Sequence, residues 1–239
     1  MNPRRLALLV GATVSLAALT ACGDDDGGGT GTITNARVRV VQAVADAPPL
    51  VNVLVDGTAP SGGSNVAYKG VVGYTPVDAG AHNVRVDNAS TGATLLETAL
   101  TVPAATDHTV YAIGQVGTGT VTSLTTLDDN SAPGSNQAKI RFMHVSPTAG
   151  PADVYVTPPG VPLTDVGRVF SNVVYADEAN GTRYVSLPAG RYQIRVASAG
   201  TTTVRIDAGS MDLGRGQIKT FVLVGGSLAQ YELLTLSDR

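Results

Sequence analysis

The sequence after residue 33 is one pattern written twice, and this duplication limits the folds open to the chain. Ala36–Val41 (ARVRVV) matches Ala138–Met143 (AKIRFM) at an offset of 102 residues. The element Tyr-x-x-(Val/Leu)-x-Ala-Gly begins at Tyr74 and again at Tyr184, where the offset has grown to 110. A period of about 100 residues is the size of a small domain, not of a solenoid repeat. The sequence therefore predicts two tandem domains of one fold, with an insertion in the second near Asp177–Gly181.

Polar and apolar residues alternate in both repeats, which is typical of strands with one buried face. Within Ala36–Val41, Val38 and Val40 alternate with arginines. Thr109–Ile113 is apolar on both faces, which favours a central strand. Turn residues separate such stretches every 8–12 positions or so, and each repeat has room for about seven strands. We therefore predict an all-β chain of two tandem immunoglobulin-like antiparallel β-sandwich domains.

The two domains are expected over residues 34–129 (repeat 1) and 137–238 (repeat 2). Residues 130–136 (NSAPGSN) are polar and contain proline and glycine, so they predict a linker. Residues 22–33 are rich in glycine and aspartate, and we expect them to form a flexible, solvated tether ahead of the first domain.

Residues 1–21 have the features of a bacterial lipoprotein signal peptide. Two arginines precede an apolar run of about 14 residues, shorter than the roughly 20 that a spanning helix needs. Leu19-Thr20-Ala21-Cys22 resembles the bacterial lipobox, and Cys22 is the only cysteine in the chain. We expect Cys22 to be lipidated, with palmitate among its chains, and to become the new N-terminus. The alternatives are an ordinary secretory signal and twin-arginine export through Arg4-Arg5.

A lipid on Cys22 would place the exported protein in the cell envelope. Glycine follows this cysteine, and aspartate at that position is the familiar signal for retention in the inner membrane. We therefore expect the outer membrane, on its periplasmic face or its surface, where the cell has one.

The composition excludes several classes of protein. A net charge of −3 argues against nucleic-acid binding. A single cysteine excludes a disulfide framework and multi-cysteine zinc sites. His82 and His108 lack the neighbours of a metal site, and Asp128-Asp129-Asn130 is more typical of a solvated turn than of a cation site. No metal and no cofactor are expected.

One group of polar residues could support catalysis. His144 and Ser146 would share a strand face, and Asp153 follows the serine by seven residues. A nucleophilic serine needs a base within reach and a third group to orient that base. Pro147 follows the serine directly, however, and Gln42 takes the histidine's position in repeat 1. We therefore expect a structural motif in which His144 holds the next turn closed and Asp153 points to solvent.

Arginines recur at matched strand positions of the two repeats. We expect them to form basic stripes on solvent-facing surfaces, where they keep the sheets soluble and discourage edge pairing. The alternative is a surface that binds an anion or a polysaccharide. The six residues are Arg37, Arg39, Arg85, Arg141, Arg195 and Arg205.

The start of repeat 2 resembles a known family. Ala138–Val156 reads AKIRFMHVSPTAGPADVYV, and it is similar to the opening of the bacterial family called domain of unknown function 4397. Repeat 1 is a degenerate copy, in which Asp46-Ala47-Pro48 fits but Gln42 and Val44 replace the histidine and serine. The resemblance implies an exported, often lipid-anchored β domain with no established activity.

These features favour a non-enzymatic binding or structural module. Its expected partners are the membrane, through the lipid, and an envelope protein or polysaccharide. Two alternatives stay open: an envelope hydrolase that uses His144 and Ser146, and a pure spacer. The hydrolase requires both side chains to be exposed in a pocket.

Overall fold

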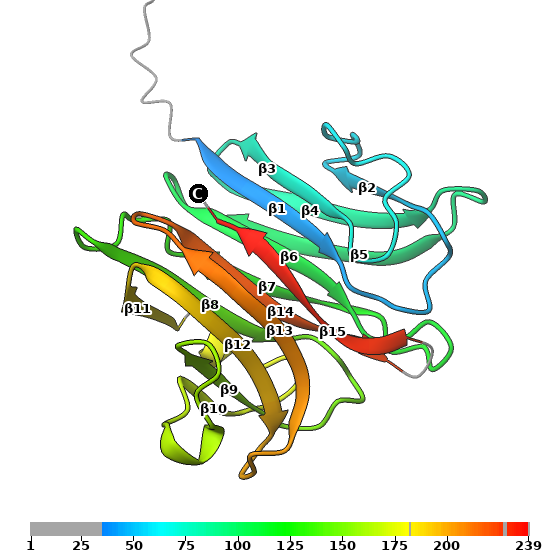
Figure 1. Cartoon of the computed structure of the whole chain (residues 1–239). Coiled ribbons are helices and arrows are strands. Elements are labelled where there is room, and N and C mark those ends of the chain that lie inside the picture. The colour runs from blue at the N-terminus through cyan, green and yellow to red at the C-terminus, as the bar shows by residue number, and fades with distance from the viewer. Residues whose placement is uncertain (1–34, 182, 227–228, 239) are drawn as a thin grey trace, which may run out of the picture. The chain divides into compact units, whose positions relative to one another are not determined.

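Strands make up most of the computed structural model, which describes residues 35–181, 183–226 and 229–238 (Figure 1). Repeat 1 contributes β1 (Ala36–Gln42), β2 (Val51–Val55), β3 (Val71–Val77), β4 (Gly80–Asn88), β5 (Thr94–Val102), β6 (Asp107–Ile113) and β7 (Thr122–Asp128). Repeat 2 contributes β8 (Gln137–His144), β9 (Ala152–Thr157), β10 (Phe170–Val173), β11 (Tyr184–Pro188), β12 (Gly190–Ser198), β13 (Val204–Leu213), β14 (Ile218–Gly226) and β15 (Ala229–Ser237), with a 3-10 helix η1 (Leu163–Asp165) and a short helix α1 (Glu178–Gly181). The signal segment, Cys22 and the tether up to residue 33 lie outside the described residues.

Each repeat folds into two sheets, which confirms the predicted all-β sandwich. Repeat 1 has an outer sheet in the order β2-β4-β5 and an inner sheet in the order β3-β1-β6-β7. Repeat 2 has an outer sheet β10-β9-β12-β13 and an inner sheet β11-β8-β14-β15. Most neighbouring strands are antiparallel, but β1 pairs with β6 and β8 with β14 in parallel. These two parallel pairs, and the additional strand β10, were not expected from the sequence.

The core of each repeat lies between its outer and inner sheets. In repeat 1, Val38 and Val40 of β1 pack against valines and leucines of the outer sheet. In repeat 2, Ile140 and Phe142 of β8 take the same places. The alternation in these strands therefore marks one buried face in each sandwich, as expected.

A third apolar cluster lies between the two repeats. Val41 and Tyr111 on the inner sheet of repeat 1 join Met143 and Val222 on the inner sheet of repeat 2. The inner sheets are thus buried on both faces, and the described residues after the tether belong to one compact unit of four stacked sheets (Figure 1). Burial on both faces explains why Thr109–Ile113 is apolar throughout.

The segment that repeat 2 inserts includes the helix α1, which contacts β7 of repeat 1 and β8 of repeat 2. Its last residue, Gly181, lies so close to Thr126 and Met143 that a Cβ atom there would be 2.9 Å from the Thr126 methyl carbon. Only glycine permits this approach. The insertion therefore closes the contact between the two repeats.

No helix within the described ranges is long and apolar enough to cross a membrane.

Candidate functional site

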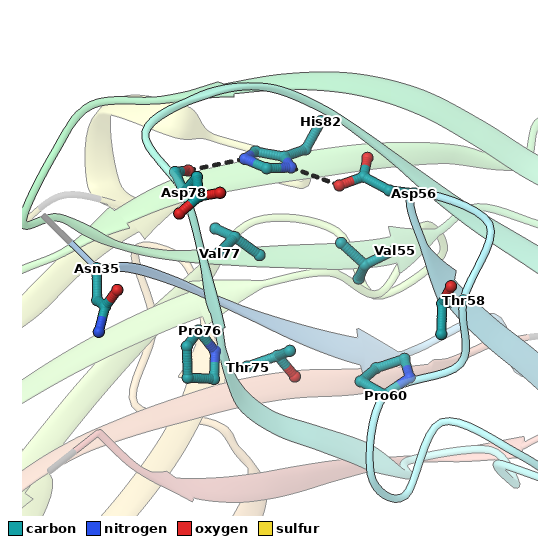
Figure 2. Close-up of a pocket in the computed structure, with 10 residues that line it drawn as sticks. All are labelled: Asn35, Val55, Asp56, Thr58, Pro60, Thr75, Pro76, Val77, Asp78 and His82. Atoms are coloured by element: carbon teal, nitrogen blue, oxygen red, sulfur yellow. Dashed lines mark hydrogen bonds and ion pairs between the residues drawn. The ribbon is translucent and has the colours of Figure 1, made fainter. Parts of the chain in front are cut away.

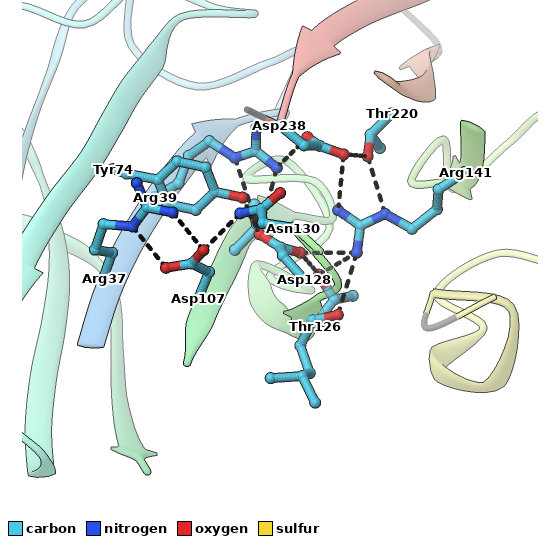
Figure 3. Close-up of polar contacts among 12 residues, drawn as sticks. Arg37, Arg39, Tyr74, Asp107, Thr126, Asp128, Asn130, Arg141, Thr220 and Asp238 are labelled. Carbon is cyan, nitrogen blue, oxygen red and sulfur yellow. Dashed lines mark hydrogen bonds and ion pairs between the residues drawn. The ribbon is translucent and has the colours of Figure 1, made fainter. Parts of the chain in front are cut away.

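Four buried charged side chains, two from each repeat, meet between the inner sheets (Figure 3). Arg39 of β1 lies 2.7 Å from the carboxylate of Asp238, which follows β15 in repeat 2. Arg141 of β8 lies 2.8 Å from Asp128, which ends β7 in repeat 1. Each arginine therefore forms its closest ion pair with the aspartate of the other repeat. We call these four residues the charge quartet.

Hydroxyl groups on the central strands complete the charge quartet within each repeat. Thr109 donates to Asp128 at 2.5 Å, and Thr220 donates to Asp238 at 2.5 Å. The Nε atoms of Arg39 and Arg141 each donate to the threonine of their own repeat at 2.9 Å. The same hydrogen bonds thus recur in both repeats, as their sequence similarity predicts.

Two tyrosines cover the guanidinium groups. The guanidinium carbon of Arg39 lies 4.6 Å from the ring centre of Tyr74, and that of Arg141 lies 4.8 Å from the ring centre of Tyr184. The hydroxyl of Tyr74 also donates to Asp128 at 2.6 Å. Burial raises the pKa of both tyrosines well above the ordinary value, so both stay neutral and able to donate.

The arginines remain charged despite their burial. Burial alone would lower the pKa of Arg39, but the nearby carboxylates of Asp238 and Asp128 outweigh it, and the pKa is raised. Burial also opposes the charge of Arg141, but Tyr111 and the carboxylates of Asp128 and Asp238 outweigh it, and the pKa is raised. Two cations and two anions in one enclosed cluster compensate each other, and no solvent-facing charge remains for a ligand. The charge quartet is therefore a structural device that fixes one repeat on the other.

The six arginines do not form the expected basic stripes. Only 2% of Arg39, 0% of Arg141 and 9% of Arg195 is exposed, so the expected solvent exposure is wrong for these three. The opposite repeat covers the first two. The third donates to the Thr157 hydroxyl at 2.8 Å and to the Val161 carbonyl at 2.6 Å, which fixes the chain after β9.

The other three arginines also have partners within the chain and lie on three different sheets. Arg37 makes two bonds to Asp107, at 2.7 and 2.5 Å. Arg85 donates to Asp87 at 3.0 Å. Arg205 donates to a backbone carbonyl in the turn after β8. The structure therefore does not gather these residues into one anion-binding face.

The motif at the end of β8 is structural, as expected for its histidine. His144 is 2% exposed, and its Nε2 lies 2.8 Å from the carbonyl oxygen of Gly150, so the ring closes the turn that contains Pro147. Burial lowers the pKa of His144. Ser146 is fully buried. The exposed pocket that the hydrolase alternative requires is therefore not formed by His144 and Ser146.

The prediction that Asp153 points to solvent is wrong. Only 1% of Asp153 is exposed, and it accepts bonds from the backbone N–H groups of Asn172 at 2.7 Å and Gly200 at 2.8 Å. Arg168 lies 2.7 Å from the same carboxylate. The alternation fails here because strand β10 and the turn after β12 each direct a backbone N–H group at this carboxylate, and these hydrogen bonds compensate for its burial.

The remaining candidates for a metal site do not converge. Across the part of the chain that the structure describes, no group of three or more histidine, cysteine or acidic side chains could hold a metal ion. In the segment Asp128-Asp129-Asn130, the first aspartate belongs to the charge quartet and the second lies 2.7 Å from the Lys139 ammonium. Burial lowers the pKa of His108, and its Nε2 lies 3.1 Å from the Thr106 hydroxyl.

An open groove of about 430 Å³ lies in repeat 1, between the end of β2 and the hairpin that joins β3 to β4 (Figure 2). Val55 and Val77 line it with apolar surface. His82 lies between two acidic residues: its Nδ1 is 2.6 Å from the Asp56 carboxylate, and its Nε2 is 2.8 Å from the backbone carbonyl of Asp78. His82 was not expected to form a site, because it lacks the sequence neighbours of a metal site; its carboxylate partner Asp56 lies 26 residues away.

The hydrogen bonds of this groove shift two pKa values. The bond to Asp56 raises the pKa of His82. The backbone N–H of Asn83, together with His82, lowers the pKa of Asp56. The pair is therefore ionic in mildly acidic solution, where the histidine carries its proton.

A second hollow of about 540 Å³ lies beside the start of the linker. Its main charged pair is already satisfied within the protein, because Arg37 and the Asn130 amide both donate to Asp107. This leaves the groove of repeat 1 as the better candidate for a ligand.

Comparisons with solved structures give only distant likenesses. The chain is similar to the TIE protein of Bacillus anthracis, with 9% identity, a TM-score of 0.25, and coverage of 80% of this chain and 34% of that one. It is similar to CBMbc, a family CBM26 domain of Amy13K from Eubacterium rectale solved with maltoheptaose, with 9% identity, a TM-score of 0.29, and coverage of 85% and 97%. The α-glucan-binding structure of a streptococcal virulence factor matches with 8% identity, a TM-score of 0.26, and coverage of 78% and 92%. The chain spans about a third of the first of these structures, and TM-scores this low carry no inference about a ligand.

No curated protein matches the chain. The family described as Domain of unknown function (DUF4397) matches residues 36–155, which run from β1 into β9. This range contains repeat 1, the linker and the His-x-Ser-Pro motif of repeat 2. Because the match takes in half of the sequence, the chain belongs to the DUF4397 family.

Proposed function

We propose that this protein is a lipid-anchored, non-catalytic module of the bacterial cell envelope that binds an envelope protein or polysaccharide. The observation that carries the proposal is the union of both repeats into one body. Two buried ion pairs, between Arg39 and Asp238 and between Arg141 and Asp128, cross from one repeat to the other. A body of this kind holds its outer surfaces in fixed positions, as a binding module requires.

The burial of the motif residues supports a non-catalytic role. His144 is buried and bonded to a backbone carbonyl, and Ser146 is enclosed. Neither side chain can reach a substrate without opening of the core. We therefore assign the motif to stability.

The anchor rests on the sequence of the signal segment, in which Cys22 ends a lipobox-like motif. Its test is membrane fractionation of cells that express the wild type, Cys22→Ala and, as a control in the tether, Asp25→Ala. The first variant should move to the soluble fraction, and the control should stay with the membrane. Retention of Cys22→Ala in the membrane would contradict the lipid anchor.

A spacer is the second candidate, because a rigid body on a tether also holds an attached object at a distance. Cross-linking in intact cells separates the two functions. A binding module should give a discrete cross-linked complex. A spacer should give no cross-linked complex. Its function should depend on the length of the tether, so deletion of Gly27–Gly29 should change the phenotype of the cells.

A further inference from the structure

We propose that the groove of repeat 1 binds a sugar ring without acidic groups, as part of a polysaccharide chain. This inference rests on the proposed binding function and names its ligand class. The groove has a volume of about 430 Å³, within the range of about 300–1,000 Å³ for small-molecule sites. It is open at the surface, so a chain can continue beyond the bound unit.

The lining of the groove matches the two kinds of surface on a sugar ring. Val55, Val77 and the ring of Pro76 offer apolar surface for the C–H face of a pyranose. Asp56, Asp78 and His82 offer polar atoms around that surface (Figure 2). Apolar contact gives affinity, and a few fixed polar groups select the orientation.

The charges of the groove exclude acidic sugars. The carboxylates of Asp56 and Asp78 are opposed by the single imidazole of His82, so the groove carries net negative charge whether or not the histidine is protonated. Asp78 also lines the groove, and its carboxylate can accept a hydrogen bond from a ligand. Hydroxyl groups of neutral sugars and ammonium groups of amino sugars can donate to it, whereas a uronic acid is repelled.

Repeat 2 supplies an internal comparison. Tyr192 takes the position of His82, and its hydroxyl donates to the carbonyl of Pro188 at 2.8 Å, just as the imidazole contacts the carbonyl of Asp78. The hairpin thus needs only one donor at this position. Repeat 2 folds without a carboxylate at the position of Asp56, because the strand register matches Val53 with Val154 and therefore Asp56 with Thr157. The histidine–carboxylate pair is therefore specific to the groove of repeat 1.

The test uses His82→Tyr, Asp78→Asn and the matched control Asp212→Asn. The first variant keeps the hairpin bond seen in repeat 2 and removes the imidazole, so the fold should persist. The second removes the accepting charge. Asp212 has a side chain that is 73% exposed on β13 and lies outside the groove. Thermal melting of each protein verifies that it is folded.

Binding is measured on a printed array of neutral, amino and acidic oligosaccharides, followed by titration of the best one. The wild type and Asp212→Asn should bind neutral or amino sugars, and both groove variants should bind at least tenfold more weakly. Equal binding by the groove variants would overturn the assignment of this groove and leave the binding function standing. Binding to acidic sugars alone, or to no sugar, would overturn the ligand class, and the cross-linking experiment then decides the proposed function separately.

Discussion

The buried Arg141 is the most direct test of how the two repeats are held together. Arg141→Met keeps much of the length of the side chain and removes its charge. The guanidinium is lost as a partner of Asp128 at 2.8 Å, of the Gly181 carbonyl at 2.9 Å and of the Thr220 hydroxyl. Asp128 then keeps Arg39 at 3.4 Å, which it must share with the second carboxylate.

Removal of one member of a buried ion pair costs about 3–5 kcal/mol, because an uncompensated charge remains buried. We expect a loss of this size in the free energy of unfolding. In a domain of this length each kcal/mol shifts Tm by about 2–4 °C, so Tm should fall by about 6–20 °C. The second change Asp128→Asn removes the surplus charge, and the double variant should recover about 1–3 kcal/mol of that loss.

The assay is urea unfolding of the mature chain with Cys22→Ala, followed by circular dichroism. Arg191→Met is the matched control, because Arg191 and Asp212 form an ion pair at 3.3 Å with side chains 61% and 73% exposed. Such a surface pair contributes at most about 1 kcal/mol. A loss below about 1 kcal/mol for Arg141→Met, or strict additivity with Asp128→Asn, would refute the reasoning.

Three further predictions concern residues of repeat 2. His144→Gln, which copies Gln42 of repeat 1, should reduce the loss of stability that occurs as pH falls below about 6.5. Burial lowers the pKa of His144, so the unfolded chain takes up a proton at a higher pH than the folded chain and is stabilised relative to it. Unfolding curves of the wild type and the variant at about pH 5 and about pH 7.5 measure the difference. Ser146→Ala should change the unfolding free energy by less than about 1 kcal/mol, because no described group forms a hydrogen bond with the buried hydroxyl. A larger loss of stability would contradict this prediction. Gly225→Ala should cost about 1–3 kcal/mol or more in thermal melts, because Gly225 has φ +120° and a Cβ atom would lie 2.6 Å from the Gln230 carbonyl oxygen. Gly73→Ala is its neutral control, since nothing lies within 4 Å, and equal Tm values for the two variants would contradict the strain.

The repeat pattern was sufficient to predict the sandwich, because alternation and turn spacing are local signals. Val38 and Ile140 face the cores that the alternation indicated. The second face of each inner sheet was wrongly expected to face solvent, because alternation shows which residues share a face but not what covers that face. A signal was present: Tyr111 and Val222 continue strands that are apolar on both faces, which a solvent-exposed inner sheet would not tolerate.

The candidate site could be predicted only in part. His144 closes a turn six residues away, a short-range contact that its sequence context suggested. The groove of repeat 1 joins Asp56, which follows β2, to His82 of β4, so no spacing rule reveals them. Asp128 was expected in a solvated turn but is buried, and Asp238 was not singled out, although the two recur at the offset of the repeat.

The exchange of ion pairs between the repeats restricts how such a module can be built in evolution. A single repeat would expose to water the apolar face of its inner sheet, together with the arginine and aspartate that are buried here. A third repeat in series would find both inner sheets already covered by each other. Gene arrangements with these residues should therefore carry the unit in even numbers. A substitution in one repeat must also be compensated by a substitution in the other, because ion-pair partners such as Arg39 and Asp238 lie in different repeats, far apart in the sequence.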